Sequence, residues 1–356
     1  MKRIVVVPFV IVAAMMFISA AAWALPFPIT DVRALGMGGA FVAAGEGIGA
    51  VNYNPALLGK NTTVGVVLPE LIVRVEDHIG MADIIDDLND SAQTVTGAIA
   101  ILNRLDQGGA TDINAYGGIG AGFGIFGISG GVTYADLIFG TAFPDNIDTT
   151  PGGLINPANN TLEFRGIEAR QLIFSGAKSF GNIIVGANMR NIKATTYTDS
   201  ENLFSDPDIG VGDVTEGIES DERVIAWDVG AVMGLTPLLD VGIVARDVGG
   251  TDLGVVEFDT RYRVGAAFYL PTLIIAADYD ITEDDEGGTE YQEWAVGGEL
   301  DLWAIALRAG LSKNSGLDGA PTLVHFGLGL GFLDFGVAYA EEGDYYIAGL
   351  NLNLGF

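Results

Sequence analysis

The last eleven residues of this 356-residue chain, YIAGLNLNLGF, alternate between two kinds of side chain. The apolar set consists of Ala348, Leu350, Leu352, Leu354 and Phe356, and the set between them consists of Gly349, Asn351, Asn353 and Gly355. Because successive side chains of a β-strand point to opposite faces, one face of this strand meets an apolar environment and the other a polar one. Such a strand could close a membrane barrel or end a soluble sandwich, and the rest of the chain has to distinguish the two.

The N-terminus carries the pattern of an exported protein. Lys2-Arg3 precedes an apolar run from Ile4 to Ala20, which is followed by Ala22-Trp23-Ala24. This order predicts a cleaved secretory signal peptide over residues 1–24, with the mature chain beginning at Leu25. An uncleaved anchor helix is the alternative, since ~17–20 apolar residues can span a bilayer.

Composition favours a barrel over a soluble secreted protein. Mean hydropathy is +0.38, yet no second apolar run after residue 24 is long enough for a membrane helix. A barrel explains both facts, because its hydrophobicity is spread over alternating strands of about ten residues. The absence of cysteine excludes disulfides, thiolate chemistry and cysteine-bound zinc. A net charge of −29 makes nucleic acid a poor partner, since phosphate binding needs a basic face.

Glycines, prolines and acidic clusters divide the remaining chain into a series of expected strands. These are Thr62–Val75, Asp112–Ile125, Gly127–Phe139, Thr161–Ser179, Asn182–Tyr197, Arg223–Leu235, Leu239–Val248, Phe258–Leu270, Thr272–Ile281, Glu290–Leu302, Ala304–Lys313, Pro321–Phe332, Asp334–Ala340 and Tyr345–Phe356. Short connections alternate with longer ones such as Glu76–Thr111 and Thr198–Glu222. An even number of strands with short turns on one rim and long loops on the other is the pattern of outer-membrane barrels. The sequence therefore predicts an all-β membrane fold, an antiparallel outer-membrane β-barrel of about 14 strands.

Alternation within the strands assigns an inner and an outer face. In Pro321–Phe332, Phe326 and Leu328 share the apolar face, whereas His325 and Gly327 share the other. The charged residues expected inside are Arg190, Asp228, Arg246, Arg261, Arg263, Asp278, Asp280 and Arg308. Charges of both signs can pair across a lumen but would be costly facing lipid.

The final strand and the outer face also predict partners. Leu350, Leu352, Leu354 and Phe356, which end the chain on an aromatic residue, resemble the assembly signal of bacterial outer-membrane barrels. This resemblance implies recognition by the barrel-assembly machinery. The apolar face implies contact with outer-membrane lipid and lipopolysaccharide.

Two features lie in the expected external loops. Apolar residues at three- and four-residue spacing from Met81 to Leu102 predict an amphipathic helix in the 76–111 loop. We expect this helix to pack as a lid on the barrel mouth in preference to forming a separate binding device. Asp206, Asp208 and Asp213 lie in a second acidic loop, but their spacing lacks the EF-hand order, so a solvated loop is favoured over a calcium site.

The segment before the first strand carries a recognisable motif. It contains RALGMGGA, with Gly36, Gly38 and Gly39, and then Asn54-Pro55-Ala56. Glycines permit close backbone packing and positive φ, and Asn-Pro fixes a turn. The two motifs in this order resemble the FadL family of outer-membrane hydrophobic-compound channels, whose relatives include the PorV-like and TraF-like barrel proteins.

The resemblance implies that residues 25–61 form a hatch inside the barrel and that residues 62–356 form the barrel itself. Residues implied at the hatch and its ligand pocket are Leu25, Phe27, Gly36, Gly38, Gly39, Asn54, Pro55 and Ala56. A lateral gate is implied at a kink in the third strand, for which Gly130 and Gly131 are candidates. The capture groove of the transporters is built from later loops than the helical one here, so it is not carried over.

No enzyme, cofactor or metal site is expected. Residues 122–127 match G-x-G-x-x-G, but another strand follows them where a dinucleotide site needs a helix. His78 and His325 lack metal-ligand spacing, and no nucleophile motif is present.

Two functions then remain. The first is passive uptake of hydrophobic small molecules, either long-chain fatty acids or aromatic hydrocarbons, across the outer membrane of a bacterial cell. The alternative is a non-transporting anchor or assembly protein of the PorV-like or TraF-like type, which binds a protein partner through its extracellular loops. The expected hatch argues against an open, ion-permeable porin.

Overall fold

The structure is a computed structural model that describes residues 29–60, 64–77, 84, 95–106, 110–150, 160–202, 218–253, 257–282, 292–316, 320–340 and 345–355. The expected signal peptide, Leu25, Phe27 and Phe356 lie outside these residues, as do Asp206, Asp208 and Asp213. The expected boundaries at residues 24 and 61 fall outside them too, so the division into signal peptide, hatch and barrel stays a prediction.

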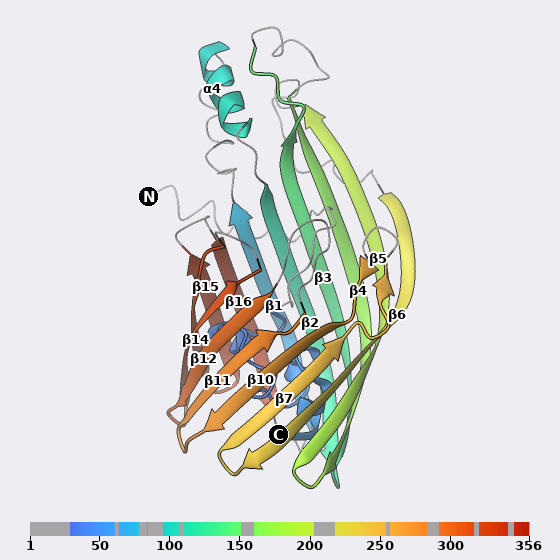
Figure 1. Cartoon of the computed structure of the whole chain (residues 1–356), viewed down its shortest axis with the longest axis vertical. Helices are drawn as coiled ribbons and strands as arrows, with labels where there is room; N and C mark the ends of the chain where they lie inside the picture. Colours follow the sequence, from blue (N-terminus) through green and yellow to red (C-terminus); the bar gives the residue numbers. More distant parts are fainter. Residues whose placement is uncertain are drawn as a thin grey trace.

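Strands make up most of the described chain (Figure 1). The helical elements are α2 (Val32–Gly36), η1 (Gly49–Asn52), η2 (Pro55–Lys60) and α4 (Val95–Leu105). The strands are β1 (Gly65–Asp77), β2 (Thr111–Ile125), β3 (Ile128–Asp145), β4 (Thr161–Phe180), β5 (Ile183–Asn202), β6 (Ile218–Thr236), β7 (Leu239–Arg246), β8 (Thr251–Asp252), β9 (Glu257–Phe258), β10 (Arg261–Tyr269), β11 (Leu273–Asp280), β12 (Glu293–Asp301), β13 (Ile305–Asn314), β14 (Leu323–Leu330), β15 (Leu333–Ala340) and β16 (Tyr345–Gly355). None of the helices in these ranges is long and apolar enough to cross a membrane.

All strands except β8 and β9 close into one antiparallel barrel of fourteen strands. The order follows the chain, with β7 next to β10 and β16 pairing with β1 across the seam. β8 and β9 pair only with each other and form a short ribbon. Each strand expected from the sequence overlaps one barrel strand, and the closed barrel confirms the predicted fold class.

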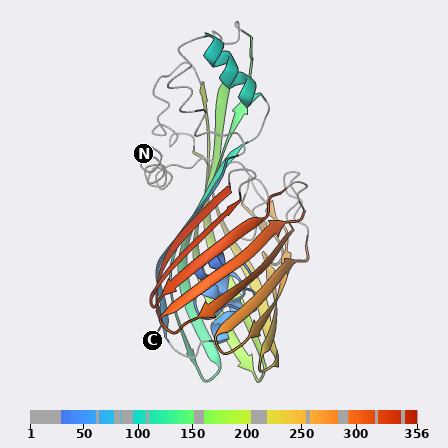
Figure 2. The ribbon, with the colours of Figure 1, turned by 90° about the vertical axis from the view of Figure 1, so that its left-hand side faces the viewer.

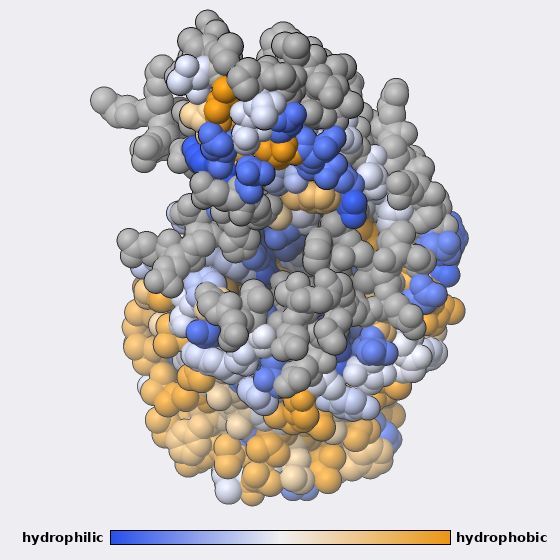
Figure 3. All heavy atoms as spheres, turned by 45° about the horizontal axis from the view of Figure 1, so that its top comes forward, coloured by the Kyte–Doolittle hydropathy of each residue, from blue (hydrophilic) through white to orange (hydrophobic). Residues whose placement is uncertain are grey.

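The side chains alternate as the sequence predicted. Phe326 in β14 is 50% exposed on the outer face, whereas its neighbour His325 is fully buried. The eight charged residues expected inside the barrel are all buried. Figure 3 shows apolar residues around the outer surface of the barrel and hydrophilic residues toward the top. This outer surface is that of an outer-membrane barrel.

The barrel is much taller on one side. β3, β4, β5 and β6 have 18–20 residues, whereas β7, β11, β14 and β15 have eight. The upper parts of the tall strands rise beyond the other strands (Figures 1 and 2). We call this region the blade: residues 139–145, 161–168, 195–202 and 218–224. The sequence did not predict that β5 extends to Asn202 or that β6 begins at Ile218. These two segments are mostly polar and show no apolar face, and pairing with the neighbouring strands holds them in place.

Helix α4 packs on the blade. Ile101, Leu102 and Leu105 are buried in a cluster with Leu162, which lies in the blade part of β4. Leu162 and Leu172 are ten residues apart in β4, which is paired regularly between them, so their side chains point to the same face of the strand. Leu172 is exposed on the outer face, and Leu162 therefore points outward too. The described part of the helix therefore covers the outer side of the blade and not the barrel mouth, where the sequence placed it.

Candidate ligand-binding site in the barrel lumen

The N-terminal segment 29–60, which we call the plug, lies inside the barrel (Figure 2). Its backbone rests directly on inward-facing glycines of the wall. A Cβ atom on Gly297 would lie 2.2 Å from the carbonyl oxygen of Met37, and one on Gly310 would lie 2.4 Å from the amide nitrogen of Gly38. The wall glycines whose Cβ would lie 2.0–2.9 Å from a backbone or side-chain atom of the plug are Gly186, Gly230, Gly242, Gly265, Gly297, Gly310, Gly327, Gly336 and Gly349. We call this set the glycine belt; a side chain at any of these positions would collide with the plug.

Carboxylates on the wall also hold the plug by its backbone. The Asp278 side chain accepts hydrogen bonds from the amides of Phe41 at 2.7 Å and Val42 at 2.8 Å. The Glu70 side chain in β1 accepts one from the Val32 amide at 2.8 Å. Such donors offset part of the cost of burying a carboxylate, and in return these two side chains fix the plug in place.

Ion pairs fasten the lower side of the plug. Arg33 donates to both carboxylate oxygens of Glu299 at 2.7 Å, and Arg308 donates to Glu299 at 2.5 Å. Lys60 donates to Asp240 at 2.7 Å. These contacts join both ends of the plug to strands on the short side of the barrel.

The hatch residues implied by the family resemblance lie in the plug, as far as the structure describes them. Gly38 and Gly39 have φ of 71° and 86°, which side chains other than glycine rarely adopt. The Asn54 side-chain oxygen accepts from the Ala56 amide at 3.0 Å and so forms the turn around Pro55. That the plug acts as a hatch during passage stays a prediction.

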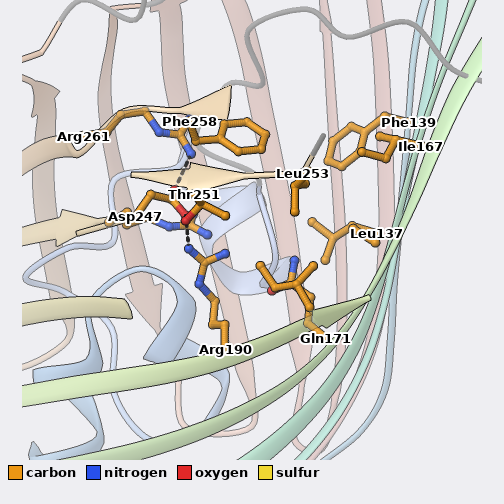
Figure 4. A pocket seen from close by; sticks show the side chains of 13 residues that line it. Leu137, Phe139, Ile167, Gln171, Arg190, Asp247, Thr251, Leu253, Phe258 and Arg261 are labelled. Carbon is orange, nitrogen blue, oxygen red and sulfur yellow. Dashed lines mark hydrogen bonds and ion pairs between the residues drawn. The ribbon is translucent and has the colours of Figure 1, made fainter. Parts of the chain in front are cut away.

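A pocket lies in the lumen between the wall strands β3–β5 and the β8–β9 ribbon (Figure 4). The space in it that can hold the centre of a water molecule is about 40 Å³, and the space between its atoms, including space open to solvent, is about 490 Å³. Figure 4 shows Leu253 and Phe258 of the ribbon on one side and Phe139 and Ile167 of the wall on the other. The complete lining is Leu137, Phe139, Ile167, Ala169, Gln171, Arg190, Ile192, Arg246, Asp247, Thr251, Leu253, Phe258 and Arg261. The pocket thus has apolar walls and a charged floor.

A buried network of charges forms this floor. Arg190 donates to Asp228 at 3.0 Å and also to Asp247, and Arg261 donates to Asp247 at 3.1 Å. The Thr251 hydroxyl donates to Asp247 at 3.1 Å and ties the ribbon to the network. Burial alone would raise the pKa of the Asp247 carboxyl, but the charges of Arg190 and Arg261 outweigh it and hold that pKa well below its usual range. Asp247 therefore stays ionised and rigidly held.

A bulge interrupts the strand pairing of β1. β1 shifts register against both neighbours around Pro69, between Leu68 and Leu71 on the β16 side and between Val67 and Glu70 on the β2 side. Such a bulge leaves one residue unpaired and bends the strand.

A small crevice lies at this bulge, with about 10 Å³ for the centre of a water molecule and about 210 Å³ between its atoms including space open to solvent. It is lined by Ile48 of the plug, by inward-facing Tyr116 and Glu70 and by Ile119, which is 49% exposed on the outer face. Tyr116 belongs to the same buried apolar cluster as Leu137 and Ile167 of the pocket. A cluster of packed apolar side chains therefore extends from the pocket to the crevice.

The candidate gate residues Gly130 and Gly131 lie in a regularly paired part of β3, which shows no register shift against β2 or β4 there. A Cβ atom on Gly131 would lie 2.4 Å from the Ile48 side chain, so this glycine accommodates the plug. In the last strand, Leu350 is 41% exposed on the outer face. A gate at Gly130 and Gly131 and an assembly signal in the last strand both stay predictions. The side chains of Leu354 and Phe356 lie outside the described residues.

Sequence reasoning did not find the pocket. It placed Arg190, Arg246 and Arg261 inside the barrel, which is correct, but gave no reason to bring them together. Leu253 and Phe258 lie in a ribbon of two-residue strands, which is too short to show a periodic pattern. The signal that could have indicated it was the set of inward charges at Arg190 in β5, Arg246 at the end of β7 and Arg261 at the start of β10.

Comparison with known proteins identifies related sequences and folds. The sequence profile of the family described as "F plasmid transfer operon, TraF, protein" matches residues 51–292, more than half of the chain. A comparison with curated proteins gave no significant match.

Solved structures with a similar fold include the toluene transporter TbuX of Ralstonia pickettii. Its TM-score is 0.64 at 13% identity, covering 92% of this chain and 98% of that one. The CymD monoaromatic hydrocarbon channel has a TM-score of 0.59 at 12% identity, with coverage of 92% and 97%. The toluene transporter TodX of Pseudomonas putida has a TM-score of 0.55 at 11% identity, with coverage of 95% and 98%. At these identities the likeness shows a shared fold.

Proposed function

Since this chain belongs to the family described as "F plasmid transfer operon, TraF, protein", we propose that it is a barrel of the bacterial outer membrane that passively admits hydrophobic small molecules. The TraF-like relatives were among the barrel proteins that its N-terminal motifs resemble. The proposed role is not enzymatic and uses no cofactor. Insertion by the barrel-assembly machinery and contact with lipopolysaccharide are part of the same proposal.

The apolar pocket is the observation that supports uptake best. Leu137, Ile167, Leu253 and Phe258 offer a hydrophobic surface inside a barrel whose lower lumen is filled by the plug. Burial of apolar area yields roughly 25 cal/mol per Å², so a ligand that buries ~150 Å² gains about 4 kcal/mol without any polar contact. Hydrocarbon channels with the same fold, such as TbuX and CymD, make an aromatic hydrocarbon the first compound to test. A long-chain fatty acid is the second.

Passage past the plug needs a route, and the crevice at β1 supplies a candidate. At Gly242, Gly297 and Gly310 the plug backbone lies directly against the wall, whereas the apolar cluster leads from the pocket to Tyr116 and the crevice. A compound that follows this cluster leaves the lumen sideways at the Pro69 bulge and enters the lipid. We propose this point, and not Gly130 and Gly131, as the lateral exit.

The experiment is native mass spectrometry of protein extracted from outer membranes in mild detergent and incubated with toluene or with a long-chain fatty acid. A variant with Ala169→Phe fills the pocket, and Ala187→Phe on the lipid-facing side of β5 is the matched control. We expect bound ligand in the native protein and the control, and at least a tenfold loss of bound ligand in Ala169→Phe. Absence of both compounds from all three proteins would contradict the proposal, and the mass of any ligand found separates the two classes.

The blade favours a second candidate, a surface anchor that binds a protein partner. It rises above the barrel on one side and carries α4 packed on its outer side, which the uptake proposal does not need. Co-purification of one stoichiometric protein, lost when residues 95–105 are deleted while the barrel remains folded, would favour this function. An empty pocket in the same preparation would then exclude uptake.

A further inference from the structure

The pocket in the lumen is too small, as it stands, for an aromatic hydrocarbon. The space in it that can hold the centre of a water molecule is about 40 Å³, whereas a cavity of ~150 Å³ lined by Leu, Ile and Phe holds one benzene molecule. Leu253 and Phe258 of the β8–β9 ribbon are 3% and 6% exposed and belong to the same buried apolar cluster as Leu137 and Ile167 of the wall. Figure 4 shows the two ribbon side chains pointing toward the wall, into the space that a ligand needs.

The ribbon is the side of the pocket that moves most easily. β4 pairs with β3 and with β5 without a register shift, and the floor is a network of ion pairs. Within the described part of the chain, the ribbon has two cross-strand pairs and no pairing with a barrel strand. Its displacement therefore breaks fewer backbone hydrogen bonds than a displacement of the wall.

The base of the ribbon is fixed and is followed by a hinge. The Thr260 hydroxyl accepts from the Gly249 amide at 3.0 Å and donates to the Asp247 carbonyl oxygen at 3.0 Å, which ties the two legs of the ribbon together. Gly249 and Gly250 have φ of 90° and 84°. Hinges consist of a few loop residues, often small, that absorb a change in φ and ψ, and glycine takes either sign of φ at little cost. The ribbon can therefore turn at Gly250 while its base stays in place.

Both legs of the ribbon also contact the charged floor. The Thr251 hydroxyl donates to the Asp247 carboxylate at 3.1 Å, and Thr251 is 1% exposed. The ring centre of Phe258 lies 5.4 Å from the guanidinium carbon of Arg261. A hydrogen bond to an ionised group is stronger than one between neutral groups, so Thr251 acts as a latch that keeps the ribbon down.

From these observations we propose that the β8–β9 ribbon is a lid on the pocket. In the closed form described here, Leu253 and Phe258 occupy the binding space, and a ligand enters by displacing them. The exchange costs little, because the apolar surface of the ligand replaces the contacts that the two side chains lose. Thr251 is a positioning residue that sets how often the lid opens. The inference rests on the proposed uptake of hydrophobic compounds and adds how their site is closed.

A thiol in the pocket reports opening of the lid without any ligand. The chain contains no cysteine, so Ala169→Cys in β4 introduces a single thiol at a pocket residue that is 5% exposed. We expect N-ethylmaleimide to modify this thiol about tenfold faster when Thr251→Val removes the latch, because a hydrogen bond to a charged group contributes at least that factor. Ala177→Cys, a buried residue of the same strand beside the plug, is the control, and Thr251→Val should not change its rate.

Toluene binding to the full chain in mild detergent gives the second readout. A lid that is mostly closed reduces the apparent affinity by the fraction that is open, so Thr251→Val should bind toluene about tenfold more tightly than the unchanged protein. A rigid pocket predicts no gain, since the substitution opens no space. Thr322→Val, at an exposed threonine outside the pocket, is the control and should bind toluene as the unchanged protein does.

The two readouts separate the lid from the uptake that it serves. Toluene binding by the unchanged protein, with no effect of Thr251→Val on either readout, would overturn the lid and leave uptake standing. Faster modification of the Ala169→Cys thiol, with no toluene bound by any of the proteins, would support the lid and contradict uptake. Equally faster modification at residues 169 and 177 would also overturn the lid, because the substitution would then have loosened the whole lumen.

Discussion

Gly36 of the plug and Gly327 of β14 face each other so closely that a Cβ on Gly36 would lie 2.9 Å from the Cα of Gly327. Two backbones meet here with no side chain between them. The plug backbone is also the nearest neighbour at Gly186, Gly242, Gly297 and Gly310 of the glycine belt. The belt accounts for nine of the 51 glycines of this chain, at positions where the plug approaches the inner wall closely.

The belt predicts that a small side chain in the wall displaces the plug. Gly310→Val places a Cβ 2.4 Å from the Gly38 amide nitrogen, and overpacking of this kind costs about 1–3 kcal/mol. We expect a leak of ions through planar bilayers that the unchanged protein does not show. Gly176→Val is the control, because nothing lies within 4 Å of its Cβ position. Equal conductance in both variants would contradict the assignment.

Deletion of Pro69 tests the lateral exit. In the structure, β1 has one extra residue against both β16 and β2 at this point. Without Pro69 the pairs Leu68–Leu352, Glu70–Asn351 and Leu71–Leu350 form a continuous ladder, and Glu70 still points inward. We expect a folded barrel that binds ligand normally but transfers it into vesicle lipid at least tenfold more slowly. An unchanged transfer rate would rule out this exit.

The buried network predicts a dependence of stability on pH. The pKa of Asp247 is lowered in the folded barrel, so its contribution is present above the pKa of an unfolded aspartate, ~3.9, and is lost as the pH falls below it. At pH 7, Asp247→Asn should destabilise the protein by about 3–5 kcal/mol, because it removes the negative charge shared by Arg190 and Arg261. Heat unfolding at pH 7 and pH 3 should show the difference from the unchanged protein narrowing at the lower pH. Asp259→Asn, at an exposed carboxylate, should show no such trend.

The contacts of α4 predict a separate effect on the blade. Leu102 is fully buried against the blade, and its replacement by alanine should cost about 2–5 kcal/mol of local stability. Limited proteolysis should then cut within residues 95–106 while the barrel strands stay protected. Asn103→Ala, at an exposed position of the same helix, should leave the cleavage rate unchanged.

The strands that face lipid on one side could be read directly from the sequence. In β14, each residue either meets lipid or meets the plug, so the alternation of Phe326 with His325 and Gly327 is strict. The same reasoning placed Arg263 and Asp278 inside. When the two faces of a strand meet different surroundings, apolar and polar residues must alternate along it. This alternation is the strongest pattern that a strand can have.

The parts that were missed lack such an environment. The upper ends of β5 and β6 stand in the blade, which rises beyond the rest of the barrel, and their mostly polar sequence shows no alternation of apolar residues. The Pro69 bulge shifts the alternation of inward and outward side chains in β1 by one residue. A run of apolar residues can contain such a shift without showing it in the sequence. The pocket joins β3, β5 and the β8–β9 ribbon, and that juxtaposition follows from barrel closure and not from local sequence.

The hydrogen bonds of Glu70 tie together three segments that are far apart in the sequence. This carboxylate belongs to the first barrel strand, and it accepts from Asn351 of the last strand at 2.8 Å and from the Val32 amide of the plug at 2.8 Å. The three segments meet at the seam where β1 and β16 join. The plug therefore does more than fill the lumen: it contributes to the closure of the barrel wall, and without it Glu70 would keep only one of these two hydrogen bonds.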